Sequence, residues 1–355
     1  MPEVSVIIPT YNYACFLGTA IQSVLTQTWQ DLELIIVDDG STDNTREVVE
    51  SFQSDHRVRY VFQSNRGDSA ARNTGISHST GRYLGFLDAD DYWMPEKLEL
   101  QLALLRSNPQ AAAVHSSAYV DTIDQQQRLI SRFLLQRPPL REKTLYEELL
   151  YNVVIVGSHS SIVLSRDVLD KVGGFDESLM CCDWDLWRRI SNEHEILYID
   201  SPLTGLRRHG ANQTANPDVV ADNSERILKK FVGEIPLLFR HHRYRMRTER
   251  YLKLAWLYFR ARRWGATFKY AAKAIFNALR CPGFTIQFLS GKLRNRLSGR
   301  APVGLQPIGM GALGMALGAA AHSGLPPESI SRTGHSAGVM PSDLAVPRTR
   351  CTDAR

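Results

Sequence analysis

The chain has 355 residues, of which 43% are hydrophobic and 22% are charged. This composition is typical of a globular protein with a large core, and it excludes a disordered chain. The net charge of +5 hides an uneven distribution. Residues 1–224 contain 19 Lys and Arg against 31 Asp and Glu, whereas residues 225–300 contain 19 against 3. We therefore expect an acidic body at 1–224 and a basic extension at 225–300.

Strands and helices alternate along the first 90 residues. Four short apolar runs are predicted strands, and helical spacing or capping residues predict helices between them. This alternation is typical of a parallel α/β sheet with right-handed crossovers. The predicted strands are 4–8, 32–37, 58–62 and 83–87, and the predicted helices are 20–25, 42–52 and 69–77.

The pattern is less regular after residue 90. We expect a polar loop at 121–144 and an end of the body near residue 224. Residues 225–300 resemble a helix pair, which must pack on the body, on a partner or on a lipid surface. Residues 301–355 are rich in Gly, Ala and Pro, and we expect a disordered tail there rather than a membrane-spanning helix. Further predicted helices are 95–107, 166–172 and 184–190, and further predicted strands are 112–120, 160–164, 196–199 and 203–207.

Three carboxylates, Asp88, Asp90 and Asp91, follow the fourth predicted strand. Such charge density is costly unless a cation offsets it, and these oxygen ligands suit Mg²⁺ or Mn²⁺ bound to a diphosphate. A solvated acidic turn is the alternative. Polar residues also end the first two strands, at 9–12 and 38–41. Because the carboxyl ends of parallel strands share one edge of the sheet, this convergence favours a binding site.

Six short motifs follow one another in order. They are VIIPTYN at 6–12, VDDGSTD at 37–43, NRG at 65–67 with ARN at 71–73, LDADD at 87–91, GGFD at 173–176 and DWDLW at 183–187. Each motif alone is weak, but the ordered set is specific. Through it, residues 4–214 resemble the family 2 glycosyltransferases. The resemblance implies the GT-A fold, a Rossmann-like α/β fold with a mostly parallel central sheet flanked by helices, here followed by a C-terminal helical extension.

The resemblance places a nucleotide at the first two strand ends. Pro9, Thr10 and Tyr11 would border the base, with the Tyr11 ring available for stacking, although they could also form a plain turn. Asp39 would accept a hydrogen bond from the base. Arg72 would reach the phosphates, because a guanidinium stays charged and can bind two oxygens. A surface ion pair is the alternative for Arg72.

The acidic run corresponds to the family's D-x-D element. By resemblance, Asp90 would ligate a divalent metal, Mg²⁺ or Mn²⁺, and Asp88 would lie near the ribose or a metal-bound water. The metal would offset the charge that develops on the departing nucleoside diphosphate. His209 would bind the metal or a phosphate, or would have a structural role. Asp91 is expected to begin a helix.

Asp183 is the candidate general base for the acceptor hydroxyl. Family members commonly carry a Glu before this Asp, whereas this chain has Cys182, so a neighbouring carboxylate is missing. Asp185 competes for the role, and Asp183 could instead only begin a helix. Ser158 and Trp184 are expected on the acceptor side.

The sequence thus predicts a metal-dependent, inverting glycosyltransferase of cell-surface polysaccharide or glycolipid synthesis. Its donor would be a nucleoside-diphosphate sugar, first of all a UDP-sugar, and its acceptor a glycan or a lipid-linked hydroxyl. The alternatives are a catalytically silent nucleotide-sugar-binding module and a nucleic-acid binder that uses the basic extension. Lipid-linked acceptors are common in the family, so an anionic membrane surface suits residues 225–300 better than nucleic acid.

The expected location is cytoplasmic, at the inner face of the cell membrane. We expect no signal peptide, because Met1, Pro2 and Glu3 lead directly into the first predicted strand. The five cysteines are an odd number at no zinc-like spacing, which favours free thiols in a reducing compartment.

Overall fold

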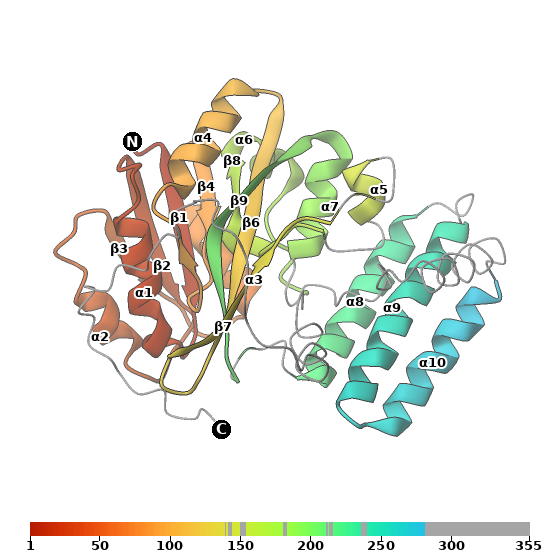
Figure 1. Ribbon diagram of the computed structural model, residues 1–355. Helices are drawn as coiled ribbons and strands as arrows, with labels where there is room; N and C mark the ends of the chain where they lie inside the picture. Colours follow the sequence, from red (N-terminus) through yellow and green to blue (C-terminus); the bar gives the residue numbers. More distant parts are fainter. Residues whose placement is uncertain are drawn as a thin grey trace, which may run out of the picture.

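The computed structural model describes residues 1–138, 140, 144–149, 154–179, 183–210, 212, 216–235 and 240–280. In this part of the chain, helices cover both faces of a nine-stranded sheet, and long helices lie beside it at one end (Figure 1). Across the sheet the strands are β3 (Val58–Phe62), β2 (Leu32–Asp38), β1 (Val4–Thr10), β4 (Tyr83–Phe86), β8 (Ile162–Ser165), β6 (Ala111–Ile123), β9 (Glu195–Arg208) and β5 (Tyr92–Trp93), and β7 (Leu129–Leu135) pairs with β6. The expected α/β class is confirmed.

The strands β1 to β4 form the parallel part of the sheet. β1 pairs with β2 and β4, and β2 pairs with β3. β1 and β2 are buried along their whole length, which is why their sequences are nearly continuous runs of Val, Ile and Leu. The residues that follow Thr10, Asp38 and Phe86 therefore lie along one edge of the sheet, as predicted.

The rest of the sheet is mixed and differs from the prediction. β8 is antiparallel to β4 and β6, whereas β9 is parallel to β6. The expected loop at 121–144 is wrong, because β6 continues to Ile123 and β7 returns antiparallel to it. Most of β7 is exposed, so pairing with β6 rather than burial stabilises it. The strands predicted at 196–199 and 203–207 form one strand, β9.

Among the described residues, two apolar cores lie on opposite faces of the sheet. Side chains alternate along β1, so that Val4, Val6 and Ile8 belong to one core and Ile7 to the other. The first core lies under α1 (Ala14–Leu25), α2 (Thr45–Glu50) and α4 (Lys97–Ser107); the second lies under α3 (Asp68–His78), α5 (Leu145–Leu149), α6 (Arg166–Val172) and α7 (Asp183–Glu193).

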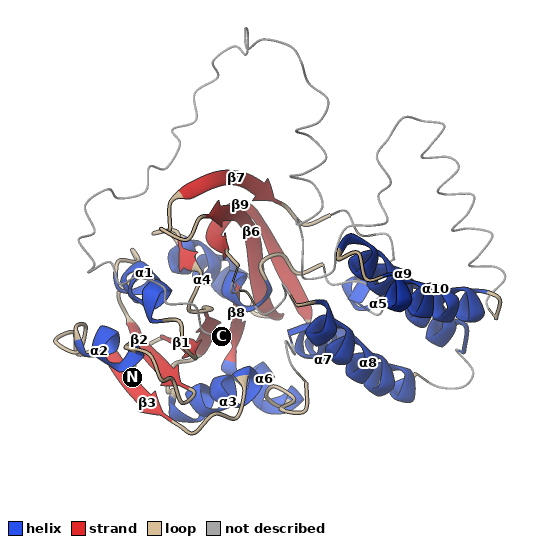
Figure 2. Cartoon of the chain, turned by 90° about the horizontal axis from the view of Figure 1, so that it is seen from below, coloured by secondary structure: helices blue, strands red, loops and turns tan. Residues whose placement is uncertain are grey.

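The described part of the extension is helical and packs on the body. Its helices are α8 (Pro217–Glu234), α9 (Arg240–Arg260) and α10 (Trp264–Ala278), which lie beside α7 (Figure 2). The Trp184 ring of α7 meets Phe231 of α8 edge-on at 5.1 Å, and the Arg250 guanidinium of α9 lies 4.1 Å from the Trp184 ring. The expected C-terminal helices are thus present, and residue 224 lies within α8.

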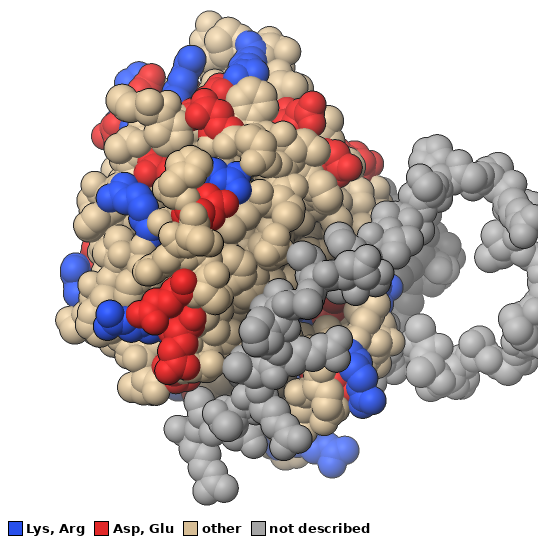
Figure 3. Space-filling model, turned by 90° about the vertical axis from the view of Figure 1, so that its left-hand side faces the viewer, with Lys and Arg blue, Asp and Glu red and all other residues tan. Residues whose placement is uncertain are grey.

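Charge is distributed differently on the body and on the extension. On the face of the body seen in Figure 3, Lys and Arg side chains are interspersed with Asp and Glu side chains. Residues 240–280, by contrast, contain 12 Lys and Arg and a single acidic residue, Glu249. The excess of positive charge therefore belongs to α9 and α10.

Some expectations concern residues that the structure does not describe. Residues 281–300 and the tail 301–355 lie outside the described residues. Among the helices that are described, none has the length and apolar character needed to cross a bilayer. Cys15 forms a disulfide bond, which differs from the free thiols that we expected; the other four cysteines lie outside the described residues.

Candidate active site

The acidic run after β4 forms a compact carboxylate cluster. Asp88, Asp90 and Asp91 follow the strand in a turn, at the edge of the sheet where α/β proteins bind ligands. One carboxylate oxygen of each residue lies within 4.8 Å of those of the other two. The cluster predicted from the sequence therefore exists, and it includes Asp91.

The electrostatics of this cluster favour a bound cation. Burial raises the pKa of Asp88 to about 7; Asp68 and Asp90 add to the shift and Arg72 opposes it. Burial, together with Asp90 and Asp88, also holds the pKa of Asp91 well above its usual range. A divalent cation would offset both effects, and carboxylate oxygens are the ligands that Mg²⁺ and Mn²⁺ prefer. The residues present therefore fit such a metal.

Asp91 does not begin a helix, contrary to our expectation, because α4 starts only at Lys97. Its carboxylate accepts hydrogen bonds from the Ser160 hydroxyl at 2.6 Å and from the Arg207 backbone N–H at 3.0 Å. The Arg207 side chain, also buried, donates to the backbone oxygen of Asp90. These contacts hold the turn in place, and sequence reasoning missed both Ser160 and Arg207.

His209 lies beside Asp90, as the sequence predicted. Its Nε2 is 3.2 Å from Asp90 Oδ2, and its ring stacks on Phe16 at 4.2 Å. Asn212, which the sequence did not suggest, donates to the same Asp90 oxygen at 2.9 Å. The imidazole is thus positioned to share a cation with Asp90 or to donate to a phosphate.

Arg72 is a buried link between two carboxylates. Its side chain is 2% exposed, and it donates to Asp68 from one nitrogen and to Asp88 from another. The guanidinium also lies 5.7 Å from the Phe175 ring. Arg72 is therefore ion-paired, as our alternative expected, but in the interior next to the acidic cluster and not on the surface.

The ends of β1 and β2 are tied together. Asn12 Oδ1 accepts from the Thr42 N–H at 2.7 Å, and the Ser41 hydroxyl accepts from the Asn12 N–H at 2.9 Å. Of the three residues expected to border a base, Pro9 and Thr10 are buried in β1, and Tyr11 is 43% exposed. The Tyr11 side chain can therefore stack on a ligand, whereas the side chains of Pro9 and Thr10 are too buried to do so.

Asp39 fastens the loop after β3. Its carboxylate accepts from the Gln63 side chain at 2.7 Å and from the backbone N–H groups of Arg66 and Gly67 at 2.8 Å each. Two carboxylate oxygens provide about four acceptor sites, so one site remains for a ligand N–H. Base reading by Asp39 stays a prediction.

Asp183 begins the described part of α7 and is 8% exposed. It accepts a hydrogen bond from the Ser158 hydroxyl at 2.6 Å. Burial raises the pKa of Asp183, while Ser158 and Arg72 lower it. Ser158 has a positive φ of 51° directly after Gly157 at 69°, a backbone strained for a non-glycine residue that aims its hydroxyl at Asp183. Cys182 lies outside the described residues.

Two other predicted residues of this helix face away from the site. Asp185 has no exposed surface and is paired with Lys230 and Arg189, both at 2.9 Å. Trp184 is 1% exposed and donates to the Leu149 backbone oxygen at 2.6 Å. Residues two positions apart point to opposite sides of a helix, which separates Asp185 from Asp183. The expectation that Trp184 lines an acceptor pocket is wrong, because the ring is part of the core.

A short 3-10 helix, η1 (Ser158–Ser161), joins the two carboxylate sites. Ser158 binds Asp183, and Ser160 donates to Asp91 while accepting from the Asp88 N–H at 3.1 Å. The Arg72 guanidinium lowers the pKa of both Asp88 and Asp183, although burial, the larger cause, raises both. The hydroxyl-rich run at 158–161 was the sequence signal for this bridge.

The fold and the site together define an α/β protein with an acidic, metal-compatible cluster at the ends of its parallel strands. The family described as Glycosyl transferase family 2 matches residues 5–173. An uncharacterized glycosyltransferase of Nostoc sp. is 34% identical over 225 residues, which is 59% of this chain and 66% of the relative. The chondroitin synthase of Escherichia coli is 29% identical over 66% of this chain and 33% of its own length. Residues 5–173 thus form a domain of glycosyltransferase family 2.

A solved structure is consistent with this assignment. The mannosyltransferase PcManGT from Pyrobaculum calidifontis, solved in complex with GDP-Man and Mn²⁺, has a similar structure. The match includes 82% of this chain and 80% of the mannosyltransferase chain, with a TM-score of 0.52 and 20% sequence identity. At this identity the likeness shows the fold alone, which is the GT-A fold, as predicted. The chain spans two thirds or less of the length of the two relatives.

Proposed function

We propose that this protein transfers a sugar from a nucleoside diphosphate to an acceptor hydroxyl, with inversion at the anomeric carbon. The observation that carries the proposal is the pairing of two carboxylate sites through η1. One is an acidic cluster suited to a metal and a diphosphate, and the other is the single buried Asp183. Inversion in one step requires such a base and no covalent intermediate.

The donor side is assigned to the strand ends. Tyr11 would stack on the base, and Asp39 would accept from it through its remaining acceptor site. Arg72 would exchange part of its pairing with Asp68 or Asp88 for phosphate oxygens, to which a guanidinium can bind in bidentate fashion. Asp88 would lie near the ribose.

Asp90 would hold the divalent metal, with Asp88 near the ribose or a metal-bound water and His209 as a further ligand or phosphate donor. When bound, the metal supplies Lewis-acid stabilisation of the diphosphate leaving group. Asn212 and the buried Arg207 keep the Asp90 turn in position, so the ligand oxygens are held before the metal arrives. The PcManGT complex contains Mn²⁺, which supports this assignment without fixing the metal here.

Asp183 would take the proton from the acceptor hydroxyl. Its raised pKa makes it a stronger base than an exposed aspartate, and the Ser158 hydroxyl orients the carboxylate. Asp185 is unsuited to this role, because its charge is already neutralised by Lys230 and Arg189. The missing Glu before Asp183 would leave Asp183 as the only carboxylate of its motif that faces the acceptor.

The donor nucleotide, the acceptor and the location are further proposals. The family resemblance favours UDP-sugars, whereas the mannosyltransferase binds GDP-Man. A glycan acceptor in polysaccharide synthesis is supported by the likeness to the chondroitin synthase. A lipid-linked acceptor in glycolipid synthesis rests on the family resemblance alone. The location at the cytoplasmic face of the membrane stays a prediction.

Asp183→Asn tests the proposal. With UDP- and GDP-sugars and Mn²⁺, we expect it to lower donor turnover by about 10²–10⁴-fold while nucleotide affinity stays within about twofold. Asp222→Asn, at an exposed position of α8, is the matched control and should keep full activity. Asp90→Asn should instead abolish the gain in nucleotide affinity that Mn²⁺ produces.

Two results would contradict the proposal. Retained turnover in Asp183→Asn would show that another group is the base. A wild-type protein that binds nucleotide sugar but neither hydrolyses nor transfers any donor would be a silent binding module.

A further inference from the structure

One side of α10 is apolar and exposed. Phe268, Ile275 and Leu279 are 69%, 60% and 74% exposed, and Trp264 is 53% exposed. Their spacing of four, seven and four residues places them on a single side of the helix. Tyr270, on the opposite side, is buried and stacks on Tyr258 of α9 at 5.5 Å. The apolar side is thus the one that faces away from the protein.

Basic residues surround this apolar side. The loop before α10 and α10 itself, up to Arg280, contain five Lys and Arg and no acidic residue. Arg263 and Lys273 are paired with acidic residues of α8. Arg262, Lys269 and Arg280 form no ion pair within the described part of the chain. Three cations therefore remain for an anionic partner.

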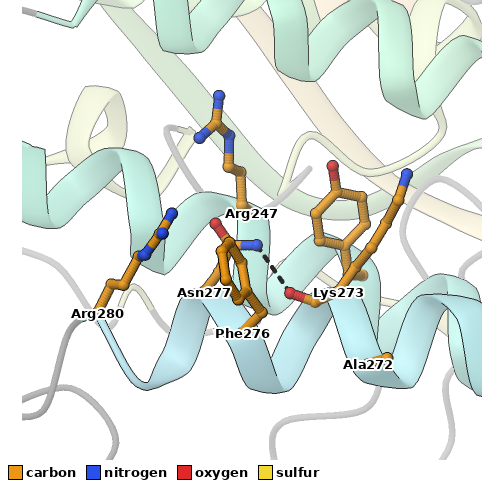
Figure 4. Close-up of a pocket in the computed structure, with 7 residues that line it drawn as sticks. Arg247, Ala272, Lys273, Phe276, Asn277 and Arg280 are labelled. Atoms are coloured by element: carbon orange, nitrogen blue, oxygen red, sulfur yellow. Dashed lines mark hydrogen bonds between the residues drawn. The ribbon is translucent and has the colours of Figure 1, made fainter.

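A groove of about 420 Å³ opens between α9 and α10 beside the apolar side (Figure 4). Arg247 of α9, Lys273 of α10 and Arg280, just after the end of α10, line it. Phe276, 55% exposed, also lines the groove, and the Arg280 guanidinium stacks on its ring at 3.9 Å. The cations of the groove are therefore continuous with the apolar surface, and guanidinium groups are suited to phosphate oxygens.

We propose that α10 docks on an anionic phospholipid bilayer, with its apolar side among the upper acyl chains and a lipid phosphate in the groove between α9 and α10. Helices that lie in a membrane interface combine a basic face with exposed Trp, Phe and Leu, as α10 does. Anionic lipids supply the charge that complements the unpaired cations. The helix lies on the membrane and does not cross it.

The apolar side decides between a membrane and a nucleic acid. A nucleic acid would engage the cations through its phosphates and could stack bases on Trp264 or Phe268. It would leave the aliphatic side chains of Ile275 and Leu279 in water, whereas an acyl-chain layer covers them. The observations therefore favour the bilayer.

The apolar contribution can be tested by co-sedimentation of the full chain with vesicles. No nucleotide or metal is added, so the result is independent of sugar transfer. We expect binding to phosphatidylcholine vesicles that contain phosphatidylglycerol, and a loss of about tenfold or more in Phe268→Ser/Ile275→Ser. Ile130→Ser, at a β7 position that is 65% exposed, is the matched control and should bind like the wild type. Unchanged binding of the double variant would overturn the proposal.

The charge contribution needs a second comparison. Arg247→Gln/Arg280→Gln should lower affinity for anionic vesicles about tenfold and weaken its salt dependence, whereas the control Arg46→Gln/Arg128→Gln should not. Equal wild-type binding to vesicles of pure phosphatidylcholine, or tighter binding to single-stranded DNA than to anionic vesicles, would overturn the proposal. A change in oligomeric state in Phe268→Ser/Ile275→Ser, with vesicle binding intact, would also overturn it.

Discussion

Asp183 is a buried carboxylate whose pKa is shifted in opposite directions by burial and by its contacts. Burial raises its pKa, and the single hydroxyl of Ser158 opposes that shift. The hydroxyl reaches the carboxylate because Gly157 and Ser158 both adopt positive φ angles. The sequence identified Asp183 by its motif and Ser158 only by its position in a polar run; the contact between them comes from the tertiary fold.

Replacing Ser158 with Ala is expected to raise the pKa of Asp183 further, because the hydrogen bond that lowers it is lost. A base with a higher pKa is protonated over a wider pH range, so the acidic limb of the kcat/KM profile should move to higher pH. Profiles of wild type, Ser158→Ala and Ser107→Ala, a control on the exposed side of α4, measure this shift. An acidic limb that does not move in Ser158→Ala would contradict the role of Asp183.

Helix α4 carries a buried lysine that its sequence pattern did not reveal. Lys97 has no exposed surface, donates to Gln101, and its Nζ lies 4.3 Å from the Trp93 ring. It forms no ion pair with any described residue. Burial holds its pKa well below the usual range, so the folded protein binds this proton less tightly than the unfolded chain.

The buried lysine predicts a dependence of stability on pH. Relative to Lys97→Met, the wild-type free energy of unfolding should rise as the pH increases toward 10.5, the usual lysine pKa. The slope has this sign because the unfolded state binds the extra proton, and it reaches at most about 1.4 kcal/mol per pH unit. Urea unfolding at several pH values measures the difference. Lys171→Met, exposed on α6, should follow the wild type; a Lys97→Met curve parallel to the wild type would contradict the prediction.

At the scale of the whole molecule, the body and the helical extension share one apolar core. Phe231 of α8, Leu254 of α9 and Trp184 of α7 are buried together in it. The boundary that charge suggested near residue 224 lies within α8 and does not interrupt this core. The sign of the net charge changes near residue 224, but the apolar core continues from the body into the extension.

Phe231→Ala is therefore expected to destabilise the whole protein by about 3–5 kcal/mol, because it leaves a cavity beside Trp184. Loss of helix, measured by far-UV circular dichroism, and loss of tryptophan burial, measured by fluorescence, should occur in one transition. Phe268→Ala, on the exposed side of α10, should change stability by less than about 0.5 kcal/mol. A separate early transition of the extension would contradict a shared core.

The sequence by itself determined the parallel strands, the acidic run and the family, since strands buried on both faces must be continuous apolar runs and strand-end motifs are local. It could not determine the β6–β7 hairpin or the single β9, because an exposed strand depends on its pairing partner. The choice between Asp183 and Asp185 as the candidate base also depended on the tertiary structure. Lys230 of α8 neutralises Asp185, whereas Ser158 of η1 orients Asp183. The same reason applies to Arg207, Ser160 and Asn212: their role is set by distance in space, which local sequence does not encode.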